Sequence, residues 1–374
     1  MRKKLLYISM FLLGTALLSA CTGGAVRGSS WPGLAADKNT VYFADGASVY
    51  AVNLKDGSEV WRYPAKVNSK QIFYAPPVIT SDGLVIVGSA GNDHILVAID
   101  PTDIDPATNS PVAAWTFTEA GDHWVASPLI IGDKLFAPNS DGYLYVLDLN
   151  DGQSQKKSVQ KILMVDPKDK KVGRLWSTPV TNGSQLFVTS LDHSVFGINL
   201  ETYTYWHQDL DGAIPGSPAI GSDGMLYIGS LAAQLEKFDP ATGEHKTALT
   251  AKNWIWSTPV VDGDTLYFGD LDGNFYSFNT VTEKLNWSVQ PDGAITATPL
   301  IVGDHILLAT ESGSIFEVDK EGRSKLWSQP GGSIYTTPAL AGDLVLVAPL
   351  GADAYLYAFN LDGSQAWLPF KPGK

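Results

Sequence analysis

Two short acidic stretches are the first candidates for chemistry, because carboxylates close to a glycine are the pattern of a calcium-binding loop. They read GDLDGN (residues 269–274) and QDLDGA (residues 208–213). The first lacks the remaining ligands and the closing glutamate of such a loop. Asp272-Gly273 also stands where other parts of the chain carry the turn sequences SDG or ESG. We therefore expect a hairpin turn there and no metal site.

Histidines are the second group of candidates, because imidazole can act as a base or as a metal ligand. They are scattered along the chain, and their spacing supports no shared site, although side chains of distant segments could still converge. We expect each histidine to lie in a turn or in solvent. The six are His94, His123, His193, His207, His245 and His305.

The sequence motifs of common enzyme classes are missing. The chain has no G-x-G dinucleotide fingerprint, no G-K-[ST] phosphate loop, no G-x-S-x-G elbow and no H-E-x-x-H zinc motif. Its single cysteine, Cys21, excludes an intramolecular disulfide and a cysteine cluster for zinc, iron–sulfur or haem. The sequence therefore predicts no catalytic residues, no cofactor and no metal.

The N-terminus has the pattern of an export signal. Three basic residues precede an apolar run over residues 5–18, which is short for a transmembrane helix of about 20 residues. The next residues, LSAC (18–21), resemble the lipobox of bacterial lipoproteins. This resemblance implies that residues 1–20 are a signal peptide, that Cys21 carries a lipid, and that residues 21–30 are a flexible tether. The alternative is an ordinary secretory signal with a chance cysteine.

The residue after the cysteine bears on location. In bacterial lipoproteins aspartate at this place is the signal for retention in the inner membrane, and this chain has Thr22 instead. The resemblance therefore implies a lipid-anchored protein of the cell envelope, outside the cytoplasm. If the host has an outer membrane, we expect the periplasmic face of that membrane.

The charge of the chain limits its partners. The net charge is −13, and loss of the three basic residues in the signal makes it −16. Such an acidic chain is unfavourable for binding nucleic acid, whose phosphates attract basic surfaces. We therefore expect protein partners and, through the lipid, the membrane.

One tract departs from this acidic character. Residues 153–174 carry seven basic and two acidic residues, a net charge of +5, and the rest of the mature chain is then −21. Two interpretations remain open: an outer strand, KILMV (161–165), with solvated lysines beside it, or a contact site for an acidic partner. The candidate contact residues are Lys156, Lys157, Lys161, Lys168, Lys170, Lys171 and Arg174.

The elements that would position these residues form an internal repeat. Eight prolines stand in similar phrases, such as WSTPVVDGD and TATPLIVGD, and are 39 to 51 residues apart. A period near 40 residues is typical of propellers and solenoids. The eight are Pro32, Pro77, Pro128, Pro179, Pro218, Pro259, Pro299 and Pro338.

A second series confirms the repeat. An apolar run ends in Asn or Asp 20 to 23 residues after each proline, at Asn53, Asp100, Asp148, Asn199, Asp239, Asn279, Asp319 and Asn360. Short runs of β-forming residues, bounded by DG, GD and NG pairs, lie between the two series. We therefore predict four antiparallel strands in each unit. The fourth carries tryptophan in six units, at Trp61, Trp115, Trp206, Trp287, Trp327 and Trp367.

Eight such units predict an all-β fold, an eight-bladed β-propeller of four-stranded blades over residues 31–374. We expect the chain to enter on the first strand of blade 1 and to leave on the fourth strand of blade 8, so that the ring closes by packing of blade faces. Blade 2 departs from the repeat with the additional sequence DPTDIDPATNSPV (100–112).

Three repeats carry a family resemblance. AVNLKDGSEVW (51–61) and AFNLDGSQAW (358–367) resemble the tryptophan-docking repeat of PQQ-like, quinoprotein-type propellers, and FDPATGE (238–244) resembles it without the tryptophan. One branch of that family is the quinoprotein dehydrogenases, which use PQQ and calcium. The other is the BamB-like lipoproteins, single propellers without catalysis that support outer-membrane protein assembly. The lipobox, the length and the blade number resemble the second branch.

The resemblance implies a non-catalytic, membrane-tethered scaffold that binds proteins in the cell envelope. Two alternatives remain: a PQQ-dependent dehydrogenase, and a lipoprotein that binds a polysaccharide or a small ligand in the central channel. The adjacent cysteine pair that packs on the quinone in the best-known dehydrogenases is missing here. Aromatic residues before the first strands could line one mouth of the channel or pack between blades: Trp124, Trp176, Trp254, Trp256 and Tyr335.

Overall fold

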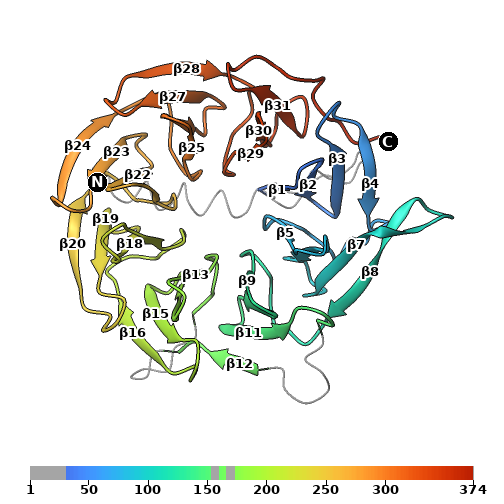
Figure 1. Ribbon diagram of the computed structural model, residues 1–374, viewed down its shortest axis with the longest axis horizontal. Helices are drawn as coiled ribbons and strands as arrows, with labels where there is room; N and C mark the ends of the chain where they lie inside the picture. The colour runs from blue at the N-terminus through green and yellow to red at the C-terminus, as the bar shows by residue number, and fades with distance from the viewer. Residues whose placement is uncertain (1–30, 153–159, 166–172, 374) are drawn as a thin grey trace, which may run out of the picture.

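The protein is a ring of eight β-sheets around a central opening (Figure 1). The computed structural model describes residues 31–152, 160–165 and 173–373. Within these ranges every regular element is a β-strand, and the strands of each sheet are antiparallel and paired in chain order. The predicted all-β, eight-bladed propeller is thereby confirmed.

Each blade begins near the centre of the ring and ends at its rim (Figure 1). Blades 1 to 4 contain β1 (Gly33–Ala36), β2 (Thr40–Asp45), β3 (Ser48–Asn53) and β4 (Glu59–Tyr63); β5 (Val78–Ile79), β6 (Val85–Gly88), β7 (Leu96–Asp105) and β8 (Ser110–Phe117); β9 (Leu129–Ile131), β10 (Lys134–Pro138), β11 (Tyr143–Asp148) and β12 (Gln160–Leu163); and β13 (Val180–Thr181), β14 (Gln185–Thr189), β15 (Ser194–Asn199) and β16 (Tyr205–Asp209).

The other half of the ring repeats this arrangement. Blades 5 to 8 contain β17 (Ala219–Ile220), β18 (Leu226–Gly229), β19 (Gln234–Phe238) and β20 (His245–Thr250); β21 (Val260–Asp262), β22 (Thr265–Gly269), β23 (Phe275–Asn279) and β24 (Lys284–Val289); β25 (Leu300–Val302), β26 (His305–Ala309), β27 (Ile315–Asp319) and β28 (Ser324–Ser328); and β29 (Ala339–Ala341), β30 (Leu344–Val347) and β31 (Tyr357–Asn360).

Both series of repeated residues occupy the predicted places. All eight prolines directly precede the first strand of a blade, where the missing N–H costs no ladder hydrogen bond. In seven units the Asn or Asp side chain accepts a hydrogen bond of 2.7–3.1 Å from the backbone N–H two residues on. The eighth, Asn360, instead donates its Nδ2 to Ser364 Oγ at 3.0 Å. The side chain thus starts the turn to the fourth strand.

One detail of the sequence prediction is wrong. Blade 8 has three regular strands, because after β31 only single bridges, Phe359 to Gln365 and Leu356 to Phe370, take the place of a fourth strand.

The additional sequence of blade 2 has a defined structure. It lengthens β7 and β8 into a hairpin whose pairing shifts between Asp100 and Ile104, and this hairpin projects from the rim (Figure 1).

The core lies between neighbouring blades. The second and third strands are almost fully buried, and their side chains alternate between the two faces of a sheet, so each hydrophobic cluster joins two blades. One cluster contains Leu34 and Phe43 of blade 1 with Leu346 and Phe370 of blade 8. The ring therefore closes by packing of faces, as the sequence predicts.

Tryptophans at the outer edges of five blades bond to the next blade. The indole Nε1 donates to a backbone carbonyl in the turn after the third strand of the following blade. The five bonds run from Trp115 to Leu149 (3.2 Å), Trp206 to Pro240 (2.9 Å), Trp287 to Lys320 (2.8 Å), Trp327 to Leu361 (3.2 Å) and Trp367 to Leu54 (3.1 Å). The last of these fastens blade 8 to blade 1.

A glycine with positive φ lies under each of these tryptophans. The φ values are 56° to 85°, a region that costs other residues free energy, and a Cβ would meet the indole ring or the tryptophan backbone at 2.0–2.8 Å. The pairs are Gly152 with Trp115, Gly243 with Trp206, Gly322 with Trp287, Gly363 with Trp327, and Gly57 with Trp367.

Where the tryptophan is missing, the glycine is missing too. Blades 3 and 5 have no tryptophan on the outer strand, and the facing turns of blades 4 and 6 hold Tyr203 (φ 57°) and Glu283 (φ 53°). Tyr203 accepts a hydrogen bond of 2.9 Å from Lys134 of blade 3. A larger turn residue thus replaces the indole contact with a polar contact to the preceding blade.

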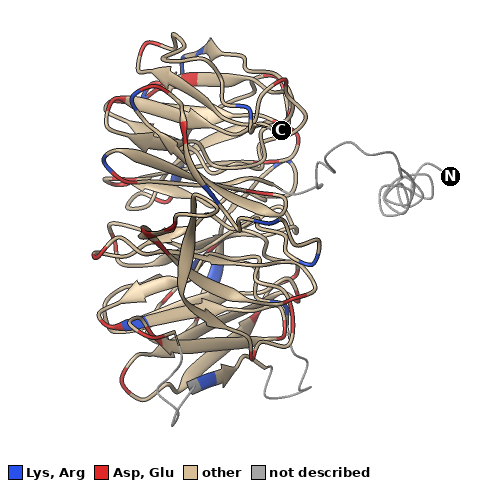
Figure 2. Cartoon of the chain, turned by 90° about the vertical axis from the view of Figure 1, so that its right-hand side faces the viewer, with Lys and Arg blue, Asp and Glu red and all other residues tan. Residues whose placement is uncertain are grey.

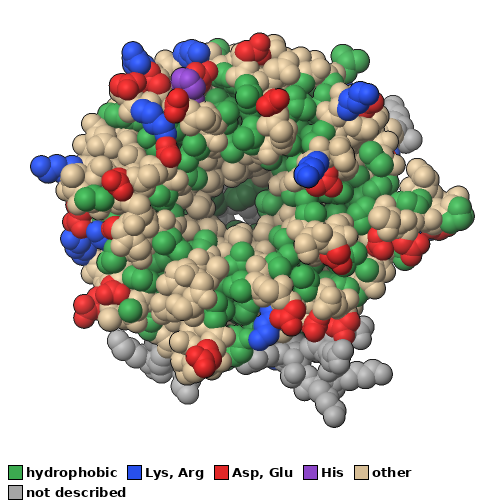
Figure 3. Space-filling view, in the orientation of Figure 1, with side chains coloured by type: hydrophobic (Ala, Val, Ile, Leu, Met, Phe, Trp, Pro, Cys, Tyr) green, Lys and Arg blue, Asp and Glu red, His purple; other side chains and the backbone are tan. Residues whose placement is uncertain are grey.

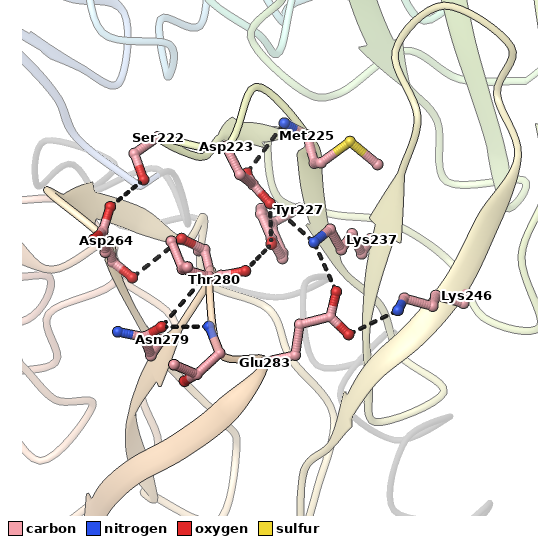
Figure 4. A network of polar contacts seen from close by, with 12 residues as sticks. Ser222, Asp223, Met225, Tyr227, Lys237, Lys246, Asp264, Asn279, Thr280 and Glu283 are labelled. Carbon is pink, nitrogen blue, oxygen red and sulfur yellow. Dashed lines mark hydrogen bonds and ion pairs between the residues drawn. The ribbon is translucent and has the colours of Figure 1, made fainter.

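Glu283 makes such a polar contact with two lysines of the preceding blade (Figure 4). Its carboxylate lies 2.8 Å from Lys237 Nζ and 2.7 Å from Lys246 Nζ, both in blade 5, and Lys237 also contacts Asp223 at 2.9 Å. Hydrogen bonds from Lys237 and Lys246 lower the pKa of Glu283 to about 2. The carboxylate therefore stays ionised in neutral and mildly acidic solution, and the bridge between blades 5 and 6 persists there.

Candidate functional site

A cavity of about 610 Å³ opens at the centre of the ring, where Figure 3 shows the molecule to be hollowed. Its lining residues lie just before the innermost strands of blades 1 to 4 and 8 or in nearby turns. Trp31, Tyr74, Pro76, Val125 and Trp176 give it a largely apolar wall. Such a cavity with few polar groups is a typical binding site for an apolar or aromatic segment.

Trp31 lies across this cavity. Its ring stacks on Tyr335 at 5.6 Å between centroids and meets Trp256 edge-on at 5.7 Å. These partners precede the first strands of blades 8 and 6, whereas the rest of the cavity wall comes mainly from blades 2 to 4. The side chain at the start of blade 1 therefore joins several blades at the channel.

Some of the aromatic residues expected at the mouth line or border the channel, and others pack between blades. Trp176 lines the cavity and donates its Nε1 to Ser140 Oγ at 3.1 Å. Trp256 contacts Trp31, and Trp254 is exposed. Trp124, however, is fully buried against Phe117 and Tyr145, where it packs between blades.

Polar groups gather on one side of the cavity. Asp122 and His123, in the linker between β8 and β9, line it together with Arg174. Burial acts to raise the pKa of Asp122, but hydrogen bonds from His123 and the charge of Arg174 outweigh it and hold the pKa below its usual value. An ionised carboxylate therefore faces the cavity.

The structure also brings together two histidines that the sequence spacing left apart. The rings of His94 and His123 lie 5.1 Å apart between centroids, and ligand atoms of His94, Asp122 and His123 lie within 4.8 Å of one another. His94 and His193 occupy turns, as expected, and His245 and His305 are exposed at the starts of β20 and β26. The expectation is wrong for His207, which lies within β16 with its side chain only 10% exposed and its ring 5.0 Å from that of Phe196. The pair in blade 2 was missed because its members are far apart in sequence.

The acidic stretch at 269–274 forms the predicted turn. Asp270 is fully buried, and its carboxylate accepts hydrogen bonds from the backbone N–H groups of Asp272 (3.0 Å) and Asn274 (2.9 Å) and from Tyr276 Oη (2.8 Å). These hydrogen bonds occupy the carboxylate oxygens of Asp270, which a cation would need as ligands. The second stretch, 208–213, comprises the end of β16 and the start of the linker to β17.

Two of the candidate contact residues are described. Lys161 is exposed on β12, the outermost strand of blade 3, with its Nζ 4.5 Å from the centroid of the Tyr143 ring. Arg174 is exposed at the central cavity. The described part of the tract thus has Lys161 on the outermost strand of blade 3 and Arg174 at the channel. Outside the described residues lie Lys156, Lys157, Lys168, Lys170, Lys171 and also Cys21.

The cavity is a poor match for PQQ. This cofactor is a flat quinone with three carboxylates, which need several cationic or N–H donors. The described lining offers one guanidinium, Arg174, and places the carboxylate of Asp122 beside it. The described lining therefore does not satisfy the carboxylates of this quinone.

Among the described residues, no helix has the length and hydrophobicity that a membrane span requires.

Acidic residues lie on both faces of the ring, as the side view of Figure 2 shows. The full sequence has 39 Asp and Glu residues and 26 Lys and Arg residues.

Comparison with known proteins supports a single assignment of fold. A family model described as outer membrane protein assembly factor BamB matches residues 16–246, 194–330 and 293–371. BamB from Moraxella catarrhalis is 21% identical, with 90% of this chain and 94% of that chain covered and a TM-score of 0.63. The computationally designed Ika8 protein is 13% identical, with 90% and 98% covered and a TM-score of 0.66. At these identities, the two structures show the fold alone.

One curated protein is related over a shorter stretch. Lupanine 17-hydroxylase [cytochrome c] of Pseudomonas sp is 24% identical over 185 residues, 45% of this chain and 26% of that protein. The chain thus spans about a quarter of the length of this relative, and the match covers only part of the ring.

Proposed function

Because this chain belongs to the family of outer membrane protein assembly factor BamB, we propose that it is a non-catalytic, membrane-tethered scaffold that binds other proteins during the assembly of outer-membrane β-barrels. The observation that carries the proposal is the extent of the family match, which runs from residue 16 to residue 371 and so includes every blade. A ring of this kind offers a rigid surface on which loops can hold partners.

The contact surface of this proposal is the basic tract of blade 3. The net charge of residues 153–174 is +5 and that of the rest of the mature chain is −21. An acidic partner would be attracted to this tract and repelled elsewhere, which favours one orientation of docking. Of its candidate contact residues, Lys161 is exposed on the outermost strand of blade 3 and Arg174 at the channel, so a partner that contacts both would reach from the rim to the channel.

Charge reversal tests this surface. Replacing Lys168, Lys170, Lys171 and Arg174 with glutamate should leave the fold intact and reduce crosslinking to a β-barrel assembly component in intact cells by more than about tenfold. The control reverses four exposed lysines elsewhere, Lys55, Lys66, Lys70 and Lys284, with the same change of net charge. The attraction should also weaken with salt, because the screening length is about 10 Å at 0.1 M.

Partners are identified by mass spectrometry of the crosslinked bands. An unchanged set of partners in the tract variant would show that these residues are only a solvated loop. Equal losses in both variants would show a general effect of charge and would equally contradict the proposal.

A redox enzyme is the second candidate, and the partial similarity to a hydroxylase is the observation that favours it. Oxidation of an alcohol or a sugar by the pure protein, dependent on added PQQ and calcium, would support this candidate and contradict the scaffold proposal. The poor match of the cavity to PQQ is the reason that we place it second.

A further inference from the structure

Three potential metal ligands meet beside the central cavity. His94 lies in the turn between β6 and β7, and Asp122 and His123 lie in the linker between β8 and β9. One ligand atom from each residue lies within 4.8 Å of the other two. All three side chains are half-buried, so they are accessible to an ion and are partly shielded from bulk water.

The propeller fold itself does not require these residues. In other blades the left-handed turn position of His94 (φ 51°) is held by a glycine, by Ala233 or by His193. His123 directly precedes Trp124, a buried residue whose N–H donates to the carbonyl of Ser89, just after β6, at 3.1 Å. The corresponding residues of blades 4 to 7 are Ala213, Trp254, Ala294 and Ser333, so no other of these blades has a histidine at both positions. The cluster is therefore a departure from the repeat in blade 2.

Surrounding hydrogen bonds hold the backbone of all three residues. The Nε1 of buried Trp124 donates to the carbonyl of His94 at 2.8 Å. The carbonyl of His123 accepts from the N–H of Ser140 at 3.0 Å, and the carbonyl of Asp122 accepts from Asn139 Nδ2 at 2.9 Å. Only the side chains need to adjust for their ligand atoms to converge.

We propose that His94, Asp122 and His123 bind a divalent transition-metal ion with the ligand preference of Zn²⁺. Two imidazole nitrogens and one carboxylate oxygen suit zinc, which binds each at about 2.0–2.2 Å, whereas calcium prefers oxygen alone. Rotation of the half-buried side chains brings the ligand atoms from 4.8 Å to the spacing of a tetrahedral site. Asp122 would then exchange its contact with His123 for the metal.

Three protein ligands leave one coordination position open. Asp122 and His123 line the cavity, so this position is accessible from it, to water or to a donor group of a ligand held there. This inference goes beyond the proposed scaffold function, and binding of the ion by the isolated protein is measured independently of any partner.

Zinc titration by isothermal calorimetry tests the site. The full mature chain is used without an affinity tag and with Cys21→Ser, which removes the only thiol. We expect one Zn²⁺ per chain and a loss of affinity of more than about tenfold in His94→Asn and in Asp122→Asn, since loss of even an outer partner of a ligand costs about 10–100-fold.

The matched control is His193→Asn. His193 lies at the same turn position in blade 4, also with positive φ (80°), but it faces the Ala213 linker, which has no histidine. Asparagine tolerates this backbone region, so both histidine variants should keep the turn. Circular dichroism checks the fold, and Asp122→Asn keeps the test decisive if His94→Asn does not fold. Co²⁺ should give visible absorption bands that both site variants lose.

The proposal is overturned if the protein binds no stoichiometric Zn²⁺. It is equally overturned if His94→Asn and Asp122→Asn bind as tightly as the parent, or if His193→Asn loses as much affinity as they do.

Discussion

Replacing Gly243 with alanine should lower the free energy of unfolding by about 2–5 kcal/mol. Of this, about 1–2 kcal/mol comes from placing a Cβ at a φ of 77°. The rest comes from crowding, because the Cβ would lie 2.6 Å from Cε3 of Trp206. That indole is held by its bond to the carbonyl of Pro240 and stacks on Phe238 at 6.2 Å, so it cannot move away freely.

A second glycine of blade 5 separates these contributions. Gly224 has almost the same φ, 76°, and a Cβ there would meet nothing within 4 Å. Gly224→Ala should therefore show the conformational cost alone. Urea unfolding monitored by tryptophan fluorescence compares the two variants. In a double variant, Trp206→Ala should recover most of the additional loss, because the clash disappears. Equal destabilisation by Gly243→Ala and Gly224→Ala would show that contact with the indole contributes nothing.

Replacing Cys21 with serine should move the protein from the membrane fraction to the soluble fraction almost completely. The residues before Cys21 have the pattern of a lipoprotein signal, which implies that this residue carries the lipid anchor. Only nine steps separate Cys21 from residue 30, which reach at most roughly 30 Å at about 3.3 Å per residue, so the lipid would keep the ring close to the membrane.

Fractionation with a salt wash measures this effect. The wash removes proteins that are held by charge alone, and Thr22→Ser serves as a control that keeps the cysteine. If Cys21→Ser remains in the washed membranes as fully as the parent protein, lipid attachment at this residue is wrong.

The sequence predicted the ring because its repeated residues act locally. Each proline precedes a strand, and each Asn or Asp bonds to a backbone N–H two residues on, so both kinds of residue do their work within one blade. Local rules therefore predicted the strands of the eight units, and among the described residues the prediction of four strands fails at blade 8, whose outer edge has only single bridges.

Contacts between blades were harder to predict. Trp206 and Gly243 are 37 positions apart and belong to different blades, so the motif letters alone do not show that they touch. The replacement of glycine by Tyr203 and Glu283 becomes understandable only once the preceding blades are seen to lack the tryptophan. Predicting such pairs requires knowledge of which blades are neighbours in space as well as of the sequence pattern within each blade.

The cluster in blade 2 was missed for the same reason. His94 and His123 lie 29 positions apart, on different connections of one blade, and no metal motif has this spacing. One signal in the sequence could have found them. When the repeats are superposed, blade 4 also has a histidine, His193, at the position of His94, but among the described residues only blade 2 combines it with a histidine at the position of His123. A combination that breaks the repeat without need is a candidate for function.

If this protein supports the assembly of outer-membrane β-barrels, as we propose, the abundance of those barrels in the outer membrane measures that role most directly. Quantitative mass spectrometry of outer-membrane fractions would compare cells that have the protein, cells that lack it, and deleted cells that express it again. We predict that several β-barrel proteins fall in abundance when the protein is absent and return when it is restored. Unchanged β-barrel abundance in cells that lack the protein would contradict the account.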